Sequence, residues 1–276
     1  MCHDRGMSQA WRRHRVALPW GRLSVQVAGD GPPVLLLHGL GGSGRYWAGL
    51  APHLAGRRTL IAPDLAGFGR SDKPDVDYSR AFHLGALDGL LRALGIEGPV
   101  SVAGHSMGGV LAALFAAWRP EGVDALALAA SPFPRPRRHA HGPPPRGRVQ
   151  LAAYRTVQLL LPALAPLVRS QTFPRAVVAD YLRHTVTSYG LTSQSLIWDV
   201  AALDELDGLR RLDAVAQLLL YSNADKTITL DSLERWQALL PQAETRIVPG
   251  GHQLLLRDGF SVLAEWLSQP AAARVA

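Results

Sequence analysis

Cysteine is almost absent from this chain, because Cys2 is the only one among 276 residues. A single cysteine forms no intrachain disulfide and supplies no multi-thiolate zinc site, so the composition fits a reducing compartment. Lysine is nearly as rare: Lys73 and Lys226 are the only two, and arginine supplies almost all of the basic charge behind the net charge of +7. Aromatic residues are not interleaved with the arginines and no nucleic-acid-binding motif is present, so we expect no nucleic-acid partner.

Long apolar runs are missing as well. The most apolar stretch, from Val149 to Leu167, is interrupted by Arg155, Pro162 and Pro166, whereas a membrane-spanning helix needs about 20 apolar residues in succession. Residues 1–20 contain four arginines but lack the apolar core of a secretory signal peptide. We therefore predict a cytoplasmic protein with no membrane span. Its oligomeric state is unknown from the sequence.

Apolar residues alternate between short β-branched runs and longer runs rich in alanine and leucine. With 47% hydrophobic residues, the chain can bury a large core. The short runs predict strands at residues 23–27, 34–37, 59–62, 99–103, 123–129, 215–221 and 245–248. The longer runs predict helices at residues 46–54, 82–94, 110–118, 230–240 and 260–267. This order predicts an α/β fold with a mostly parallel central sheet flanked by helices.

The alternation breaks after the strand at 123–129. Residues 131–148 contain six prolines and five arginines, which excludes a helix or an interior strand there. Helical patterns follow at residues 149–167, 175–189 and 193–203 before the alternation resumes. We therefore predict an α/β core formed by residues 1–131 and 208–276, with a helical cap or lid inserted between its two parts at residues 132–207.

The most informative motif is Gly104-His105-Ser106-Met107-Gly108-Gly109, which lies between a predicted strand and a predicted helix. A serine in such a turn has the arrangement of a nucleophile elbow. The backbone turns so sharply that a Cβ two residues before or after the serine would collide with its neighbours. The following helix begins there and offers its dipole and free N–H groups to an anionic intermediate. Ser106 is therefore the predicted nucleophile.

A serine is a poor nucleophile at neutral pH and needs a base that is itself oriented by an acid. His252 follows the last predicted strand in Pro249-Gly250-Gly251-His252, and Asp225 follows the preceding strand in Ser222-Asn223-Ala224-Asp225. Sites in open α/β sheets gather at these carboxyl ends of parallel strands. Ser106, Asp225 and His252 are thus the predicted nucleophile, acid and base, and they follow one another in the order nucleophile, acid, base along the chain.

Over nearly its whole length the chain resembles the α/β-hydrolase fold family, in its branch of lidded serine esterases. The resemblance is carried by His38-Gly39 after one strand, the segment from Asp64 to Asp72 after the next, the elbow at residues 104–109, and His252. It implies that the backbone N–H groups of Leu40 and Met107 form the oxyanion hole. It also implies chemistry that needs no cofactor and no metal.

The acid loop departs from the family pattern. Family members often have Gly-x-x-Asp-x-x-x-Pro there, whereas this chain has Ser222 and Thr229 at the outer positions. Other carboxylates occur before this loop, and we interpret them as solvated charges on helix faces: Asp199, Asp204 and Asp207. Asp225 remains the predicted acid.

Several other residues have a structural interpretation that is simpler than a functional one. His38 is expected to hold its loop through hydrogen bonds, and His105 to pack beside the site. His139 and His141 lie in the proline-rich and arginine-rich loop without a carboxylate or thiolate partner, so we expect no metal there. Aromatic residues near the loops either pack in the core or line a pocket: Tyr46, Trp47 and Phe68.

The sequence predicts a serine hydrolase that cleaves a carboxylic ester, or a lactone or thioester, through an acyl-enzyme. Apolar residues of the cap favour a small to medium apolar acyl substrate: Leu159, Leu160, Leu161, Leu164, Leu167, Tyr181, Tyr189 and Trp198. Two alternatives stay open. One is a carbon–carbon bond hydrolase, lyase or cyclase with the same triad, whose substrate carboxylate would need polar cap residues such as Arg155, Arg169, Arg183 and His184. The other is a non-catalytic ligand-binding protein.

Overall fold

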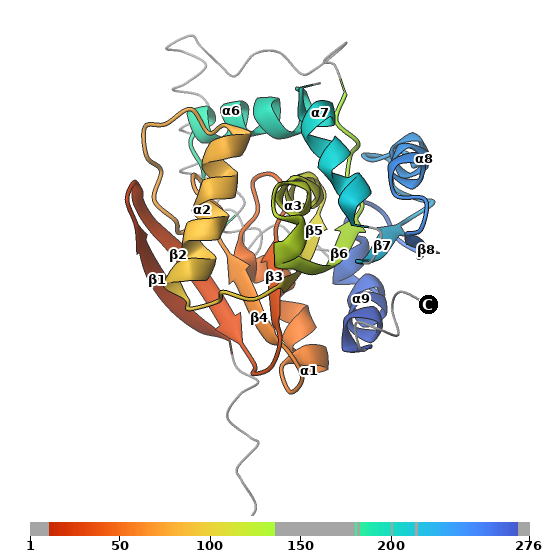
Figure 1. Cartoon of the computed structure of the whole chain (residues 1–276), viewed down its shortest axis with the longest axis horizontal. Helices are drawn as coiled ribbons and strands as arrows, with labels where there is room; N and C mark the ends of the chain where they lie inside the picture. The colour runs from red at the N-terminus through yellow and green to blue at the C-terminus, as the bar shows by residue number, and fades with distance from the viewer. Residues whose placement is uncertain (1–10, 136–179, 181–182, 200, 213–214, 270–276) are drawn as a thin grey trace, which may run out of the picture.

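The computed structural model describes residues 11–135, 180, 183–199, 201–212 and 215–269, and an eight-stranded sheet forms its centre (Figure 1). The strand order is β1-β2-β4-β3-β5-β6-β7-β8. The strands are β1 (Arg12–Leu18), β2 (Gly21–Ala28), β3 (Pro33–Leu37), β4 (Thr59–Pro63), β5 (Val100–His105), β6 (Val123–Ala129), β7 (Ala216–Tyr221) and β8 (Glu244–Ile247). Only the pairs β1–β2 and β2–β4 are antiparallel in this sheet. The predicted mostly parallel sheet is confirmed.

Helices cover both faces of the sheet. The helical elements are η1 (Gly44–Leu50), α1 (Ala51–Leu54), α2 (Arg80–Ala93), α3 (Met107–Trp118), η2 (Pro120–Gly122), α6 (Val186–Ile197), α7 (Ala202–Leu206), η3 (Asp207–Arg211), α8 (Leu230–Leu239), η4 (Leu254–Leu256) and α9 (Gly259–Ser268). One buried apolar cluster contains residues of α2, α3, α6, α7 and α8, and the other contains residues of η1, α1 and α9. Figure 1 shows α1 and α9 below the sheet and α2 and α6 above it.

The central strand β5 shows how the sequence builds these two layers. All six of its residues are buried, because both faces of a parallel sheet are covered. Val100 and Val102 belong to the cluster on the α3 side, and Ala103 belongs to the cluster on the α9 side, as the two-residue period of a strand requires. The end of β5 therefore lies deep in the molecule, and it carries the Ser106 turn.

Two predicted elements near the N-terminus differ from the structure. The sequence indicated no strand before residue 23, but β1 pairs with β2 along its whole length. Only Val16 of β1 is buried, so this edge strand shows no apolar period. The helix predicted at 46–54 is mainly the 3₁₀ segment η1, followed by the four-residue α1. Pro52 stands in the first turn of α1, where its missing N–H costs no hydrogen bond.

The helix boundaries predicted around residue 190 are wrong. One helix, α6, runs from Val186 to Ile197 through the predicted break, and the chain stops being helical before Ala202. The start is fixed by a capping box, in which Thr185 and Ser188 each accept a backbone N–H bond from the other. The helix predicted at 149–167, and residues 175–179 of the next, lie outside the described residues. The division into core and cap stays a prediction.

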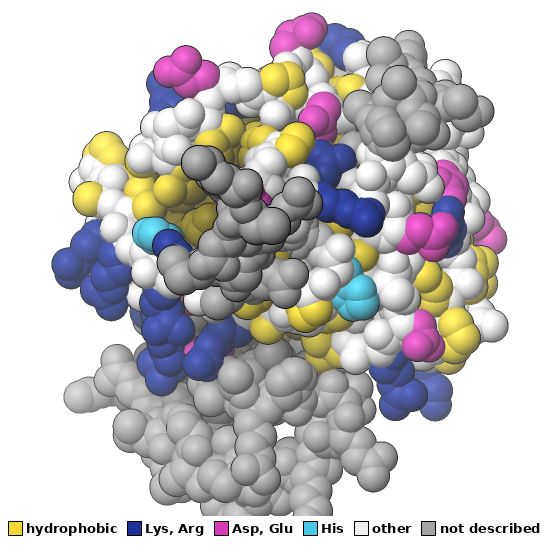
Figure 2. Space-filling view, turned by 90° about the horizontal axis from the view of Figure 1, so that it is seen from below, with side chains coloured by type: hydrophobic (Ala, Val, Ile, Leu, Met, Phe, Trp, Pro, Cys, Tyr) yellow, Lys and Arg dark blue, Asp and Glu magenta, His cyan; other side chains and the backbone are white. Residues whose placement is uncertain are grey.

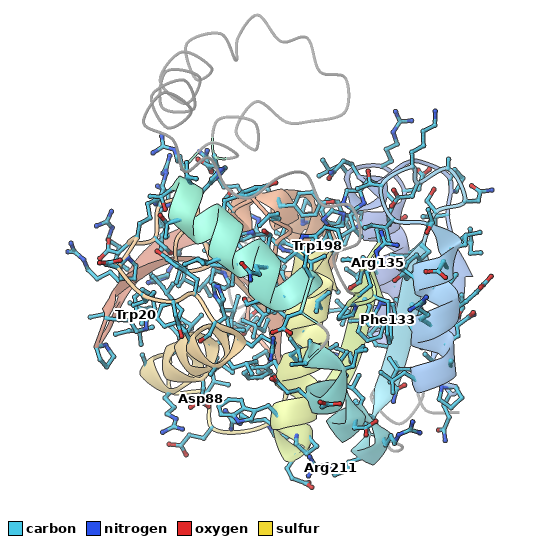
Figure 3. The ribbon with its side chains drawn as sticks, turned by 90° about the horizontal axis from the view of Figure 1, so that it is seen from above. Trp20, Asp88, Phe133, Arg135, Trp198 and Arg211 are labelled. Atoms are coloured by element: carbon cyan, nitrogen blue, oxygen red, sulfur yellow. The ribbon has the colours of Figure 1, made fainter. Side chains whose placement is uncertain are left out.

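Helix α6 is hydrogen-bonded to the core by a row of polar side chains. Their spacing places them on one helix face, and their partners lie on α2 and on the loops before it. The bonds are Ser188 Oγ to Gly67 O (2.9 Å), Thr192 Oγ1 with His83 Nε2 (3.1 Å) and Ser195 Oγ to Tyr78 O (2.9 Å). Near the far end of α6, the Arg135 N–H donates to Ile197 O (3.3 Å), and Figure 3 shows Arg135 close to Trp198. No helix of the described residues is long and apolar enough to span a membrane.

Candidate active site

The turn after β5 has the strained backbone of a nucleophile elbow. Ser106 has φ 54° and ψ −126°, a region that residues with a Cβ rarely adopt. A Cβ on Gly104 would lie closer than 3.0 Å to Gly108 O, and one on Gly108 would lie equally close to Leu37 O. The collisions predicted on both sides of the serine are confirmed. Helix α3 starts at Met107, so the serine stands at a helix N-terminus.

The three side chains predicted as nucleophile, base and acid meet in one hydrogen-bonded row. His252 Nε2 lies 3.0 Å from Ser106 Oγ, and His252 Nδ1 lies 2.9 Å from Asp225 Oδ2. Ser106 and His252 are partly exposed, whereas Asp225 is buried. This order lets the imidazole take a proton from the serine while the carboxylate holds the other ring nitrogen.

Asp225 is held as a carboxylate by its own loop. Its Oδ1 accepts the backbone N–H groups of Thr227 (2.7 Å) and Ile228 (2.9 Å). Burial by itself raises the pKa of Asp225, but the hydrogen bonds from His252, Ile228 and Thr227 and the His252 charge outweigh it, so the pKa lies below its ordinary value. The carboxylate is therefore ionised throughout the neutral range and orients the imidazole.

Ser222 explains how the acid loop works without the glycine of the family pattern. Its hydroxyl donates to Gly250 O and accepts the Ala224 N–H (3.2 Å). One side chain therefore ties the loop that carries Asp225 to the loop that carries His252. Sequence reasoning recorded this serine only as a departure, because no local pattern shows a contact 28 residues away.

The loop after β3 lies directly beside Ser106. A Cβ on Gly39 would lie 3.2 Å from Ser106 Cβ, and a turn is closed by the Gly42 N–H donating to Gly39 O (2.9 Å). Leu40 lies within this turn, and Met107 follows the serine directly. The hydrogen bonds found among the described residues use neither the Leu40 N–H nor the Met107 N–H.

His38 connects two loops rather than serving as a second base. It is fully buried, with Nδ1 2.8 Å from Gly39 O and Nε2 accepting the Leu65 N–H (2.9 Å). Burial lowers the pKa of His38, which keeps Nε2 free to accept. The predicted role in holding the loop is confirmed.

His105 packs beside the site, as expected, and also makes a hydrogen bond that sequence reasoning missed. Its Nε2 lies 2.8 Å from His252 O, and its ring stacks on Tyr46 with the centroids 4.6 Å apart. Burial lowers the pKa of His105 to about 3, so the ring is neutral and its Nε2–H donates to the backbone of the base. Tyr46, Trp47 and Phe68 are buried in the apolar core.

The other carboxylates considered from the sequence lie away from His252. Asp199 pairs with Arg80 (2.6 Å), Asp204 is exposed, and Asp207 pairs with Arg210 (3.4 Å) at the surface. The described residues contain no group of three or more metal-ligating side chains. His139 and His141 and most of the apolar cap residues lie outside the described residues, as do Arg155 and Arg169. A hollow of about 240 Å³ is lined by η3, β7 and the end of α8, and none of the predicted site residues borders it.

Comparisons with known proteins agree with this architecture. A family model described as alpha/beta hydrolase fold matches residues 32–258. An uncharacterised protein of Mycobacterium tuberculosis is 47% identical over 107 residues, which are 39% of this chain and 31% of that protein. A 2-hydroxy-6-oxo-6-(2'-aminophenyl)hexa-2,4-dienoic acid hydrolase of Metapseudomonas resinovorans is 38% identical over 108 residues, 38% of this chain and 37% of that enzyme. The matched segments thus span about a third of these relatives.

Solved structures are similar over almost the whole chain. The thioesterase domain from the curacin biosynthetic pathway superimposes with a TM-score of 0.72. The match covers 94% of this chain and all of that domain, at 21% identity. At this identity the similarity concerns the fold, and the chemistry has to be argued from the site.

Proposed function

The chain belongs to the alpha/beta hydrolase fold family, whose model matches residues 32–258, and we propose that it is a serine hydrolase. Its substrate in this proposal is a carboxylic ester, or a lactone or thioester, with a small to medium apolar acyl group. The observation that carries the proposal is the continuous row of hydrogen bonds from Ser106 through His252 to Asp225. A cytoplasmic location stays a prediction from the sequence.

In the proposed first step, Ser106 Oγ attacks the acyl carbon while His252 Nε2 takes the serine proton. Asp225 keeps the other proton on Nδ1 and stabilises the imidazolium that forms. The negative charge develops on the carbonyl oxygen, to which the backbone N–H groups of Leu40 and Met107 would donate hydrogen bonds. Loss of one such donor typically costs about a hundredfold to a thousandfold in turnover.

The second half of the cycle uses the same groups in reverse. His252 gives its proton to the leaving alcohol or thiol, which departs and leaves the acyl group on Ser106. Water then enters, His252 takes its proton, and the tetrahedral intermediate collapses to the free acid and the free serine. None of these steps needs a cofactor or a metal.

A panel of chromogenic aryl esters, from acetate to long-chain acyl groups, tests the proposal. Ser106→Ala is expected to abolish turnover, because it removes the hydroxyl that His252 Nε2 contacts (3.0 Å). Ser261→Ala is the matched control, since this serine is exposed and its hydroxyl only donates to Asp258 O in the first turn of α9 (2.6 Å). Full turnover in Ser106→Ala would contradict the mechanism.

A second candidate is hydrolysis of a carbon–carbon bond in a dienoate-like ketone by the same triad. The similarity to the dienoic acid hydrolase favours it. The two candidates separate in one assay: a carbon–carbon hydrolase consumes the dienoate faster than the aryl esters, and an esterase shows the reverse order. Consumption of neither substrate would favour a ligand-binding protein.

A further inference from the structure

The net positive charge of the chain comes from one segment. Residues 132–183 contain nine arginines and a single acidic residue, Asp180. The rest of the chain contains 20 basic and 21 acidic residues. A general bias toward arginine would raise the charge everywhere, so the excess has a local origin. The described end of this segment, at Asp180 and Arg183, shows where part of that charge lies.

Asp180 holds two arginines at the rim of the candidate active site. Its side chain is 1% exposed and contacts Arg45 Nη1 and Arg183 Nε, each at 3.2 Å. Ser43 Oγ donates to the same carboxylate (3.0 Å). A buried carboxylate needs such partners; the Arg45 guanidinium is hydrogen-bonded to Asp180 Oδ2, and Arg183 forms an ion pair with Oδ1. The one acid of the segment is thus already paired with two basic side chains.

Arg70 lies next to this group. The Asp64 carboxylate accepts the backbone N–H groups of Gly44 (2.7 Å) and Arg70 (2.8 Å), so the chain positions that carry Arg45 and Arg70 are neighbours. The Arg70 guanidinium makes no hydrogen bond or ion pair with the described residues. Burial lowers the pKa of Arg70, and the charges of Arg13, Arg45 and Arg183 lower it further, against the opposing effect of Asp180.

Arg45, Arg70 and Arg183 therefore form a basic group whose positive charge exceeds the negative charge of its carboxylate partner, Asp180. Residues 132–179 contain no Asp or Glu, so the preceding part of the segment adds no carboxylate either. Figure 2, a view from below, shows Lys and Arg side chains gathered on its left, on the side where β1 and β2 lie in Figure 1; β1 itself contributes Arg12, Arg13 and Arg15.

These arginines are close enough to Ser106 for one substrate to reach both. Gly39 contacts Ser106, and Ser43, which bonds to Asp180, is four residues further along the same loop. Consecutive Cα atoms are about 3.8 Å apart, so the Ser43 Cα lies within about 15 Å of the Gly39 Cα. An extended arginine side chain reaches about 6 Å from its Cα, a six-carbon diacid reaches about 6 Å from its acyl carbon, and the hydrogen bond between them adds about 3 Å, so together they bridge this upper limit.

We propose that Arg70 and Arg183 bind a carboxylate at the far end of the substrate's acyl chain. The inference rests on the proposed hydrolase function and specifies its substrate class: an acyl group with an apolar middle and an anionic end. A planar guanidinium matches a carboxylate through two parallel N–H bonds. Arg183, which is half exposed beside Asp180, and Arg70, which has no side-chain partner among the described residues, provide two such donors.

The test compares matched nitrophenyl esters in kcat/KM. The monoester of adipic acid has a free carboxylate, and the hexanoate ester of the same chain length has none. The parent protein is expected to prefer the adipate ester, and Arg70→Met to lower kcat/KM for that ester about tenfold to a hundredfold, the effect of losing a charge-assisted hydrogen bond. The hexanoate ester should change less than twofold, and Arg70→Lys should retain part of the preference.

Two further variants sharpen the comparison. Arg210→Met also removes one arginine charge, but at the hollow beside Gln217 near the start of β7. This variant should leave the adipate preference unchanged. Arg70→Glu should reverse the preference in favour of an ester that ends in a trimethylammonium group. Both expectations follow from a local contact, because charges more than about 10 Å apart at the surface are screened at 0.1 M salt.

The proposal is overturned if the parent shows no preference for the adipate ester. It is also overturned if Arg70→Met slows both esters equally, or if Arg210→Met has the same effect as Arg70→Met. Failure of the hydrolase function looks different, since no ester is then turned over. In that case, calorimetric binding of adipate to Ser106→Ala decides: binding that is lost on adding Arg70→Met supports the subsite, and no binding overturns it.

Discussion

Replacing Asp225 by asparagine tests the base and its orientation in one substitution. Asp225 Oδ1 accepts two backbone N–H groups, from Thr227 and Ile228. The amide oxygen of an asparagine must stay there, because the amide nitrogen would face those donors and leave both without an acceptor, at a cost of about 1–3 kcal/mol each. The asparagine N–H₂ group therefore faces His252 Nδ1.

That arrangement puts the imidazole in the wrong tautomer. His252 Nδ1 becomes the acceptor, the ring proton moves to Nε2, and Nε2 can no longer take the proton of Ser106. The loss expected for such a change is about 10⁴-fold in kcat, which corresponds to about 5.4 kcal/mol in the activation free energy. Stability should change little, since the hydrogen bonds of the loop are kept.

The assay is steady-state hydrolysis of an activated aryl ester, together with the urea midpoint of each variant. Asp199→Asn is the matched control, because Asp199 is a carboxylate just after α6 that pairs with Arg80. It should keep kcat near the parent value. A loss below tenfold in Asp225→Asn, or a larger loss in Asp199→Asn, would refute the assignment of the acid.

Two further predictions concern stability. Gly104→Ala should lower the free energy of unfolding by about 1–3 kcal/mol, because its Cβ overlaps Gly108 O. Gly85→Ala, in α2, should raise the free energy of unfolding by up to about 1 kcal/mol, because nothing lies within 4 Å of the new Cβ. The urea midpoints of the two variants should therefore shift in opposite directions. Burial lowers the pKa of His83 to about 4 from 6.5, so the unfolded chain binds this proton first as the pH falls. Stability due to His83 is therefore present above about pH 6.5 and lost between 6.5 and 4, by about 2 kcal/mol from pH 7 to pH 5. His83→Gln should flatten this part of the urea midpoint curve, and an unchanged curve would contradict the reasoning.

Local sequence patterns predicted the elements of the fold that face the core. The strand that becomes β5 is apolar on both faces, and the glycines around Ser106 are required by a turn in which a Cβ does not fit. Edge strand β1 was not predicted from the sequence, because Val16 is its one buried residue. The break predicted near residue 190 failed because contacts to α2 and to the loops before it, and the Thr185 cap, favour a continuous helix.

Contacts between distant loops were out of reach of sequence reasoning. The roles of Ser222 and His105 depend on carbonyl oxygens of the His252 loop, which are 28 and 147 residues away. The grouping of Arg70 with Asp180 depends on two loops that Asp64 joins. Residue types alone suggested the triad, because its order follows the strand order, whereas side chains that only support a loop leave no such pattern.

The most direct test of the central claim is the site of covalent labelling by a fluorophosphonate. The reagent reacts with a serine that a neighbouring base activates, and peptide mass spectrometry locates the adduct. The account predicts one adduct, on Ser106, which disappears in Ser106→Ala and is strongly slowed in Asp225→Asn. An adduct on another residue, or none at all on the folded parent protein, would contradict it.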